Sequence, residues 1–273
     1  MRYALGIEYD GSEFFGWQIQ ADGRTVQGEL EKALSSVADH PITVQCAGRT
    51  DSGVHGREQV VHFDTAAKRD LRSWLLGTNA GLSEDICLRW VKEVPQQFHA
   101  RFSARARHYE YRICNRHSRP ALDRNRVAWT HRTLDVRRMQ VAADALLGEH
   151  DFTSFRAAGC QAKHANRYLY LLKLQQVEDC IVLDVVANAF LHHMVRNIAG
   201  VLMAIGRGDE EVDWTKRLLG ARDRTLGGVT APPQGLYLMG VYYPPEFDIP
   251  WSAEKFGLSI KSIKPVRGRK SED

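Results

Sequence analysis

The chain has 273 residues, of which 44% are hydrophobic and 26% charged, as is usual for a globular protein. Lys and Arg exceed Asp and Glu by 37 to 33, and this small excess permits a nucleic-acid partner without demonstrating one. Five scattered cysteines without a C-x-x-C pair argue against a disulfide framework or a zinc site. The longest mainly apolar stretch, 197–206, reaches about half the roughly 20 residues of a membrane-spanning helix, and acidic residues interrupt the start too early for a signal peptide. We therefore expect a cytoplasmic protein with reduced thiols and no membrane partner.

The first 104 residues read as strands and helices in the order β-α-β-β-α-β. Alternating apolar positions predict a strand at 2–9, and helical spacing predicts a helix from Val26 to Val37 with Thr25 as its N-cap. The remaining expected elements of this half are strands at 42–47, 58–64 and 86–94 and a helix around 71–76.

A second pattern of the same kind begins near Ala106. We expect a strand carrying Tyr109 and Tyr111 on one face, and a helix from Val136 that ends at Gly148 as its C′ residue. A hairpin at 168–187, a helix that places His192 and Arg196 one turn apart, and a strand at 236–242 complete this half. Two successive units of this kind predict an α+β protein built from two ferredoxin-like halves.

The domain division follows from these patterns. We assign residues 1–104 to an N-terminal α+β subdomain and residues 105–248 to a C-terminal one. Residues 249–273 form a C-terminal extension whose polar, basic end we expect to be partly disordered.

The densest group of chemically useful residues is A-G-R-T-D-S-G-V-H-G at 47–56, on a loop that leaves a predicted strand. Arg49 favours the charged form of Asp51, which keeps the carboxylate available as a nucleophile or base at neutral pH. Taken alone, G-R-T-D equally describes a glycine-rich turn with a surface ion pair. His192 and His193 are expected to point to opposite sides of their element, so we predict no metal site there.

Further motifs decide between these interpretations. They are Y-D-G-S-x-F-x-G-W-Q-x-Q at 9–20, Q-V-V-H-F at 59–63, F-H-A-R-F-S-A-x-A-R-x-Y-x-Y at 98–111, G-E-H-D-F-T-S-F-R-A at 148–157, N-A-F-x-H-H-M-V-R-N-I at 188–198 and G-L-Y-L at 235–238. Together with the loop at 47–56, they closely resemble the tRNA pseudouridine synthase A family, also called tRNA pseudouridine synthase I. The resemblance runs from Arg2 to about Asp248.

The resemblance implies both a fold and a reaction. The fold would be a central, mainly antiparallel sheet with an active-site cleft between the two halves. The reaction would be the isomerisation of uridine in the anticodon stem-loop of tRNA, at about positions 38, 39 and 40, after the base has been extruded from its stack. The family uses neither metal nor organic cofactor, and it acts as a homodimer that binds tRNA across both subunits.

By resemblance, Asp51 is the nucleophile or nucleophile-like carboxylate. It could attack the anomeric carbon of the ribose or carbon 6 of the base, and the sequence does not separate the two. Tyr109 would pack on the flipped base and assist proton removal from carbon 5, although a core-facing strand tyrosine fits its alternation equally well. Arg49 would fill the vacated place in the stack and pair with Asp51, and Arg196 would order the catalytic carboxylate.

Expected RNA contacts come from two groups of residues. Phe14, Trp17 and Gln18 suit stacked nucleotides and 2′-hydroxyls, with simple core anchoring as the alternative. The candidate phosphate ligands are Arg101, Arg105, Arg107 and Arg156. The segment Q-A-K-H-A-N-R at 161–167 departs from the family pattern, which puts local RNA contacts there in doubt.

Two other functions compete with the isomerase. A catalytically inactive tRNA-binding module would explain the basic balance and the aromatic residues, but it leaves Asp51 beside Arg49 without a purpose. A phosphoryl-transfer enzyme with an aspartyl intermediate would use the glycine-rich loop, but the sequence has no P-loop and no nearby second carboxylate for Mg²⁺.

Overall fold

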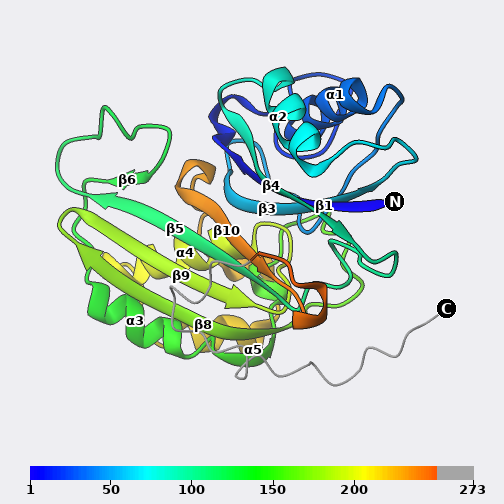
Figure 1. The fold of residues 1–273 in the computed structure, drawn as a ribbon. Helices are drawn as coiled ribbons and strands as arrows, with labels where there is room; N and C mark the ends of the chain where they lie inside the picture. The colour runs from blue at the N-terminus through cyan, green and yellow to red at the C-terminus, as the bar shows by residue number, and fades with distance from the viewer. Residues whose placement is uncertain (251–273) are drawn as a thin grey trace. The chain divides into compact units, whose positions relative to one another are not determined.

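The computed structural model describes residues 1–250 as an α+β protein whose strands pair mainly antiparallel (Figure 1). It divides into two compact units, one formed by Met1–Ala104 with the described residues from Leu236 onward, and the other by Arg105–Gly235. Residues 236–248, which the sequence patterns assign to the C-terminal subdomain, group with the first unit. That residues 1–104 and 105–248 form two separate subdomains stays a prediction. The predicted disorder of the extension falls almost entirely outside the described residues.

The first unit has the ferredoxin-like order of elements. Strands β1, β3 and β4 form an antiparallel sheet in the order β4-β1-β3, with the short β2 antiparallel to β3. The order of these elements along the chain, β-α-β-β-α-β, is the predicted one. Strand β10 adds to β3 in parallel. The elements are β1 (Arg2–Tyr9), α1 (Val26–Ala38), β2 (Gln45–Cys46), β3 (His55–Asp64), α2 (Leu71–Gly81), β4 (Ile86–Val94) and β10 (Leu236–Tyr242).

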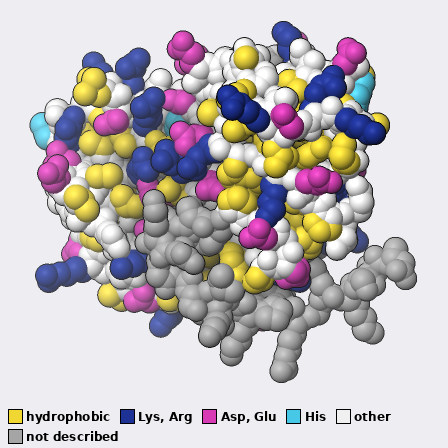
Figure 2. Space-filling model, in the orientation of Figure 1, with side chains coloured by type: hydrophobic (Ala, Val, Ile, Leu, Met, Phe, Trp, Pro, Cys, Tyr) yellow, Lys and Arg dark blue, Asp and Glu magenta, His cyan; other side chains and the backbone are white. Residues whose placement is uncertain are grey.

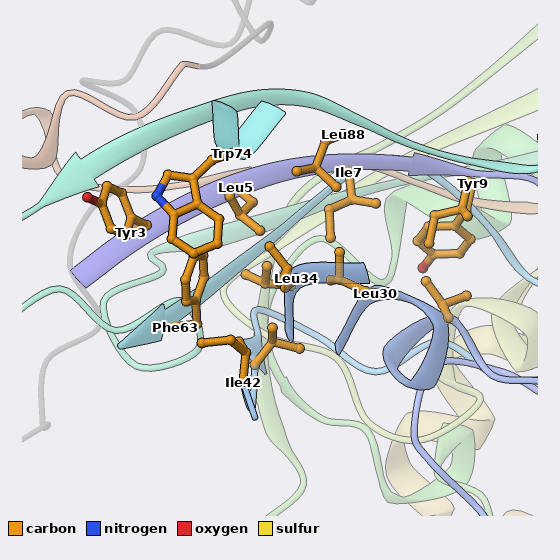
Figure 3. Close-up of a cluster of buried hydrophobic side chains, with 14 of the residues drawn as sticks. Tyr3, Leu5, Ile7, Tyr9, Leu30, Leu34, Ile42, Phe63, Trp74 and Leu88 are labelled. Atoms are coloured by element: carbon orange, nitrogen blue, oxygen red, sulfur yellow. The ribbon is translucent and has the colours of Figure 1, made fainter. Parts of the chain in front are cut away.

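The core of the first unit lies between its sheet and the two helices (Figure 3). Trp74 of α2 is fully buried, and its ring lies edge-on to Phe63 with 5.1 Å between ring centroids. Leu30 and Leu34 of α1 point into the same cluster. The helix begins where expected because the Thr25 hydroxyl accepts a hydrogen bond from Gly28 N.

The elements of the second unit follow one another in the order β-β-α-β-β-β-α-α. Its sheet runs β5-β9-β8-β7 with antiparallel pairs, and β6 adds to β5 in parallel. Helix α3 packs against α4 and β8. The elements are β5 (Ala106–Asn115), β6 (Ala128–Thr130), α3 (Val136–Asp144), β7 (Gly148–Asp151), β8 (Asn166–Val177), β9 (Cys180–Ala187), α4 (Met194–Gly206) and α5 (Trp214–Ala221). No helix within residues 1–250 combines the length and apolar character needed to cross a bilayer.

Several boundaries differ from the prediction for local reasons. Helix α3 ends at Asp144, and Gly148, with a φ of 92°, opens β7 instead of capping the helix. Helix α4 begins at Met194, so His192 precedes it and does not share a helix face with Arg196. His193 adopts a left-handed φ of 59°, which separates the two histidines from the helical turn that follows.

Candidate active site

Asp51 lies on the loop that joins β2 to β3, and its side chain is half-buried. The entry to this loop is fixed by β3, because Ala47 N donates to Val60 O at 2.8 Å and the amide of buried Gln59 donates to Gly48 O at 2.5 Å. The loop therefore leaves the sheet in a defined direction. Arg49, the predicted partner of Asp51, is exposed on the same loop.

A second loop, between the 3-10 helix η1 (Gly11–Glu13) and α1, supports the Asp51 loop through its backbone. Trp17 N donates to Thr50 O at 3.0 Å. Gly16, with a φ of 88°, lies so close that an added Cβ would stand 2.9 Å from Thr50 O and 3.2 Å from the carbonyl carbon of Asp51. Only glycine combines this backbone conformation with this approach.

The side chains of Phe14 and Trp17 are only 2% and 1% exposed and belong to the core of the first unit. Their predicted stacking on RNA is not supported by this position. They match the core-anchoring alternative and hold the supporting loop in place. Gln18, the third residue of that prediction, is exposed.

Two further side chains, those of Tyr9 and His55, fix the Asp51 loop, although no motif assigns them a role. The Tyr9 hydroxyl and Thr50 Oγ1 are 2.8 Å apart in the buried interior. Where the loop ends, His55 Nδ1 accepts from Gly11 N at 3.1 Å, and the His55 ring stacks on Tyr237 with 4.5 Å between centroids. These residues stand inside the quoted motifs, but the motif letters alone do not say that they contact one another.

Arg101 is exposed on the segment that follows β4, and this segment is also well anchored. His62 Nδ1 accepts from Ala100 N at 3.1 Å, and the Tyr243 hydroxyl donates to Ala100 O at 2.6 Å. Burial, with His99 nearby, lowers the pKa of His62 to about 4, so the ring is neutral at pH 7 and can accept that hydrogen bond.

In the second unit, Tyr109 lies on β5 and is 8% exposed. Its ring meets Phe190 edge to face, with 5.0 Å between centroids and 82° between planes. The ring is thereby fixed by packing. The structure thus places Tyr109 largely in the interior, as its alternation on the strand predicts.

Arg196 lies in the first turn of α4 and is half-buried. Its Nε donates to Ala231 O at 2.8 Å, and Ala231 N donates back to Arg196 O at 3.1 Å. The Tyr111 hydroxyl donates to the next carbonyl, that of Pro232, at 2.8 Å. Burial raises the pKa of Tyr111, and the nearby charge of Arg196 partly offsets this rise, so Tyr111 is a neutral neighbour of the guanidinium.

The chain that carries Ala231 is pressed onto α4. A Cβ at Gly200 would stand 1.9 Å from Val229 O, so the segment crosses the helix at this glycine. Arg224 holds the same segment through Gly228 O at 3.0 Å. Asn197, which is 2% exposed, accepts from the Thr230 hydroxyl at 2.7 Å. We call residues 228–231 the strap. No periodic pattern in the sequence indicates the strap, because it has no regular structure.

The four arginines predicted to bind phosphate fall into two groups. Arg101 and Arg105 are exposed and remain candidates. Arg107 is 8% exposed and donates to Asn188 O at 3.0 Å, and Arg156 donates to Ala162 O at 3.0 Å and to the carbonyl of Cys160. These two guanidinium groups donate to backbone carbonyls, and their predicted contacts with phosphate stay a prediction.

The prediction that His192 and His193 point apart is wrong. Their ring centroids are 4.0 Å from each other, because the left-handed conformation of His193 turns its side chain back toward its neighbour.

On the face shown in Figure 2, basic side chains occur in small groups with acidic and hydrophobic ones between them. The charge pattern of that face is therefore mixed, as the small net charge predicts.

Comparison with known proteins identifies the family. A family model described as tRNA pseudouridine synthase matches residues 6–103 and 142–244. Relatives named tRNA pseudouridine synthase A include those of Methylococcus capsulatus, 56% identical over 91% of this chain and 92% of the relative, and Coxiella burnetii, 53% identical over 91% and 95%. A solved archaeal box H/ACA Nop10-Cbf5 complex is similar at 9% identity over 74% of this chain and 44% of that one, with a TM-score of 0.33, too low to support an argument. The chain belongs to the tRNA pseudouridine synthase family, a family of isomerases.

Proposed function

We propose that this protein isomerises uridine to pseudouridine in the anticodon stem-loop of tRNA, at about positions 38, 39 and 40, with extrusion of the target base. Family membership supports the reaction, and the motif resemblance supports the substrate sites. The observation that carries the proposal is the position of Asp51, a half-buried carboxylate on a loop held by β3 and by the Gly16 loop.

The reaction is balanced without any added reagent. The bond between N1 and the ribose C1′ breaks, a bond between C5 and C1′ forms, C5 loses a proton and N1 gains one. There is no net oxidation and no group is lost, so the chemistry calls for neither a redox cofactor nor a nucleotide. Asp51 would attack C1′ or carbon 6 of the base, and both routes use a preformed carboxylate.

The other roles are assigned from the motifs. We propose that Tyr109 packs on the extruded base and assists proton transfer at C5. Arg49, exposed beside Asp51, would take the place of the base in the stack and pair with the carboxylate. Arg196 would order that carboxylate by its charge. Its Nε donates to Ala231 O, which holds the guanidinium in place.

RNA affinity would rest on shape and charge. The enzyme accepts neighbouring uridines in different sequence contexts, so base-edge recognition cannot carry the affinity, and A-form stems hide their major groove. The exposed Arg101 and Arg105 are the phosphate contacts that we retain.

We also propose that the protein acts in the cytoplasm, where its substrate is found, and as a homodimer. Light scattering with and without tRNA measures the second point.

The test is tritium release from tRNA labelled at carbon 5 of uridine, with EDTA present and no nucleotide. Each uridine isomerised by the wild-type protein should release its tritium. Tight tRNA binding without release would favour the inactive tRNA-binding module. Release only after a metal or nucleotide is added would overturn the cofactor-free mechanism.

A further inference from the structure

The loop that supports Asp51 presents one aromatic ring to solvent. Among loop residues 14–25, all of them described, Phe14 and Trp17 are buried, whereas Phe15 is 57% exposed. A phenyl ring that is 57% exposed gains only part of the hydrophobic stabilisation that full burial would give. Its position therefore calls for an explanation other than core packing.

The ring of Phe15 is held rather than loose. Gly23, with a φ of 99°, lies against it so closely that an added Cβ would stand 2.7 Å from two ring atoms. The Phe15 backbone is fixed on both sides, because its N–H donates to Arg24 O at 2.8 Å and its carbonyl accepts from the Gln20 amide at 2.7 Å. The ring orientation is thus set before any ligand arrives.

Arg24 in turn anchors this arrangement. Its guanidinium makes bonds to Glu29 at 2.7 Å and to both carboxylate oxygens of Asp85, at 2.6 and 2.8 Å. Its carbon Cζ also lies 4.3 Å from the centre of the buried Phe14 ring. The backbone partner of Phe15 is therefore part of the rigid body of the first unit.

Phe15 is also close in the chain to the contacts of Asp51. The next residue, Gly16, is the one whose missing Cβ allows Thr50 and Asp51 to approach. The preceding residue, Phe14, accepts a hydrogen bond from Gly53 N at 3.4 Å. Phe15 therefore stands between two residues whose backbone contacts the Asp51 loop.

We infer that Phe15 is a stacking platform for a nucleobase of the substrate RNA that flanks the uridine presented to Asp51. Every base has a flat aromatic face, so a phenyl ring binds one without reading its identity, as an enzyme with several sequence contexts requires. A ring already fixed by Gly23 loses little conformational entropy on binding. The inference rests on the proposed function, since it takes tRNA as the ligand.

The test compares Phe15→Ala, Phe15→Leu and Phe15→Trp with the control Leu76→Ala, which removes another exposed apolar side chain of the first unit, on α2. Affinity is measured with unlabelled tRNA, and turnover by tritium release. Stacking is read from an anticodon stem-loop RNA that carries 2-aminopurine on either side of the target uridine, because its fluorescence falls when the base stacks.

Phe15→Ala should weaken tRNA binding about tenfold and reverse the fluorescence decrease at one flanking position. Phe15→Trp should preserve both signals, Phe15→Leu should preserve neither, and Leu76→Ala should match the wild type. Melting temperatures check that all variants are folded. Wild-type affinity and fluorescence in Phe15→Ala, or equal performance of Leu and Trp, would overturn the inference. A wild-type protein that releases no tritium would instead overturn the proposed function, and the binding and fluorescence measurements would still report on Phe15.

Discussion

Asp51 and Arg196 are each held in place by a neighbouring segment of chain that packs closely at a glycine. The two regions nevertheless differ in their secondary structure. Around Asp51, two irregular loops hold each other at Gly16 by backbone contacts. Around Arg196, a regular helix carries the residue and the strap crosses it at Gly200. A change at the first crossing would move Asp51 directly. A change at the second moves the strap while the helix keeps its hydrogen bonds, so we expect it to affect stability more than turnover.

Among residues on helices and strands, we expect the largest loss of turnover from a substitution of Tyr109. Tyr109 lies on β5 and its ring packs on Phe190, so Tyr109→Phe should fold normally. Turnover should fall about a hundredfold or more if the hydroxyl takes part in proton transfer. Single-turnover tritium release at saturating tRNA measures this. Turnover that survives in Tyr109→Phe but not in Tyr109→Leu would assign a stacking role instead.

The loop-to-loop contact is tested by Gly16→Ala, with Gly148→Ala as its matched control. Both glycines have a positive φ, of 88° and 92°, but an added Cβ meets nothing within 4 Å at Gly148. Each substitution should lower the free energy of unfolding by roughly 1–2 kcal/mol through backbone strain. Only Gly16→Ala should also lower turnover, about tenfold to a hundredfold, by displacing Asp51. Equal turnover in the two variants would show that the loop contact does not position the carboxylate.

The strap is tested by Gly200→Ala, with Gly220→Ala as its control on another helix. At Gly200 an added Cβ would overlap Val229 O, whereas at Gly220 it meets nothing within 4 Å. We expect Gly200→Ala to destabilise the protein by roughly 1–3 kcal/mol, and Gly220→Ala to be neutral or stabilising by up to about 1 kcal/mol. Urea unfolding gives both values. A stable Gly200→Ala variant with strongly reduced turnover would contradict our expectation that this crossing affects stability more than turnover.

The smallest effect concerns the exposed arginines. Arg101→Ala and Arg105→Ala should each reduce the slope of log affinity against log salt by roughly 0.7 to 0.9, with turnover at saturating tRNA nearly unchanged. Arg107→Ala should instead lower stability, since that guanidinium holds Asn188 O. A slope unchanged in both exposed variants, or little salt dependence in the wild type, would contradict binding through phosphates.

Periodicity predicted many of the regular elements because their apolar side chains recur at helix or strand spacing. Strands β1 and β4 coincide with their predicted ranges, and the Thr25 cap places the start of α1 correctly. The ferredoxin-like order of the first unit then follows from the element order. Helix α5 and the strap were missed, because the first is short and the second has no period at all.

Motifs identified the residues that matter but not the function of each one. The motif at 9–20 led us to assign RNA contacts to Phe14 and Trp17, which are buried, and to pass over Phe15, which is exposed. In an irregular loop, which side chains are buried depends on the space that the rest of the core leaves for them. A periodic pattern in the sequence therefore cannot predict it. The same holds for Arg107, whose use in holding Asn188 O depends on contacts distant in the chain.

The most direct test of the account is Asp51→Asn, assayed for tritium release and for tRNA affinity in parallel. The amide keeps the size of the side chain but removes the charge and nucleophilicity that the isomerisation needs. We predict a folded protein that binds tRNA like the wild type and releases no measurable tritium. Turnover within tenfold of the wild type would contradict the assignment of Asp51 as the catalytic carboxylate.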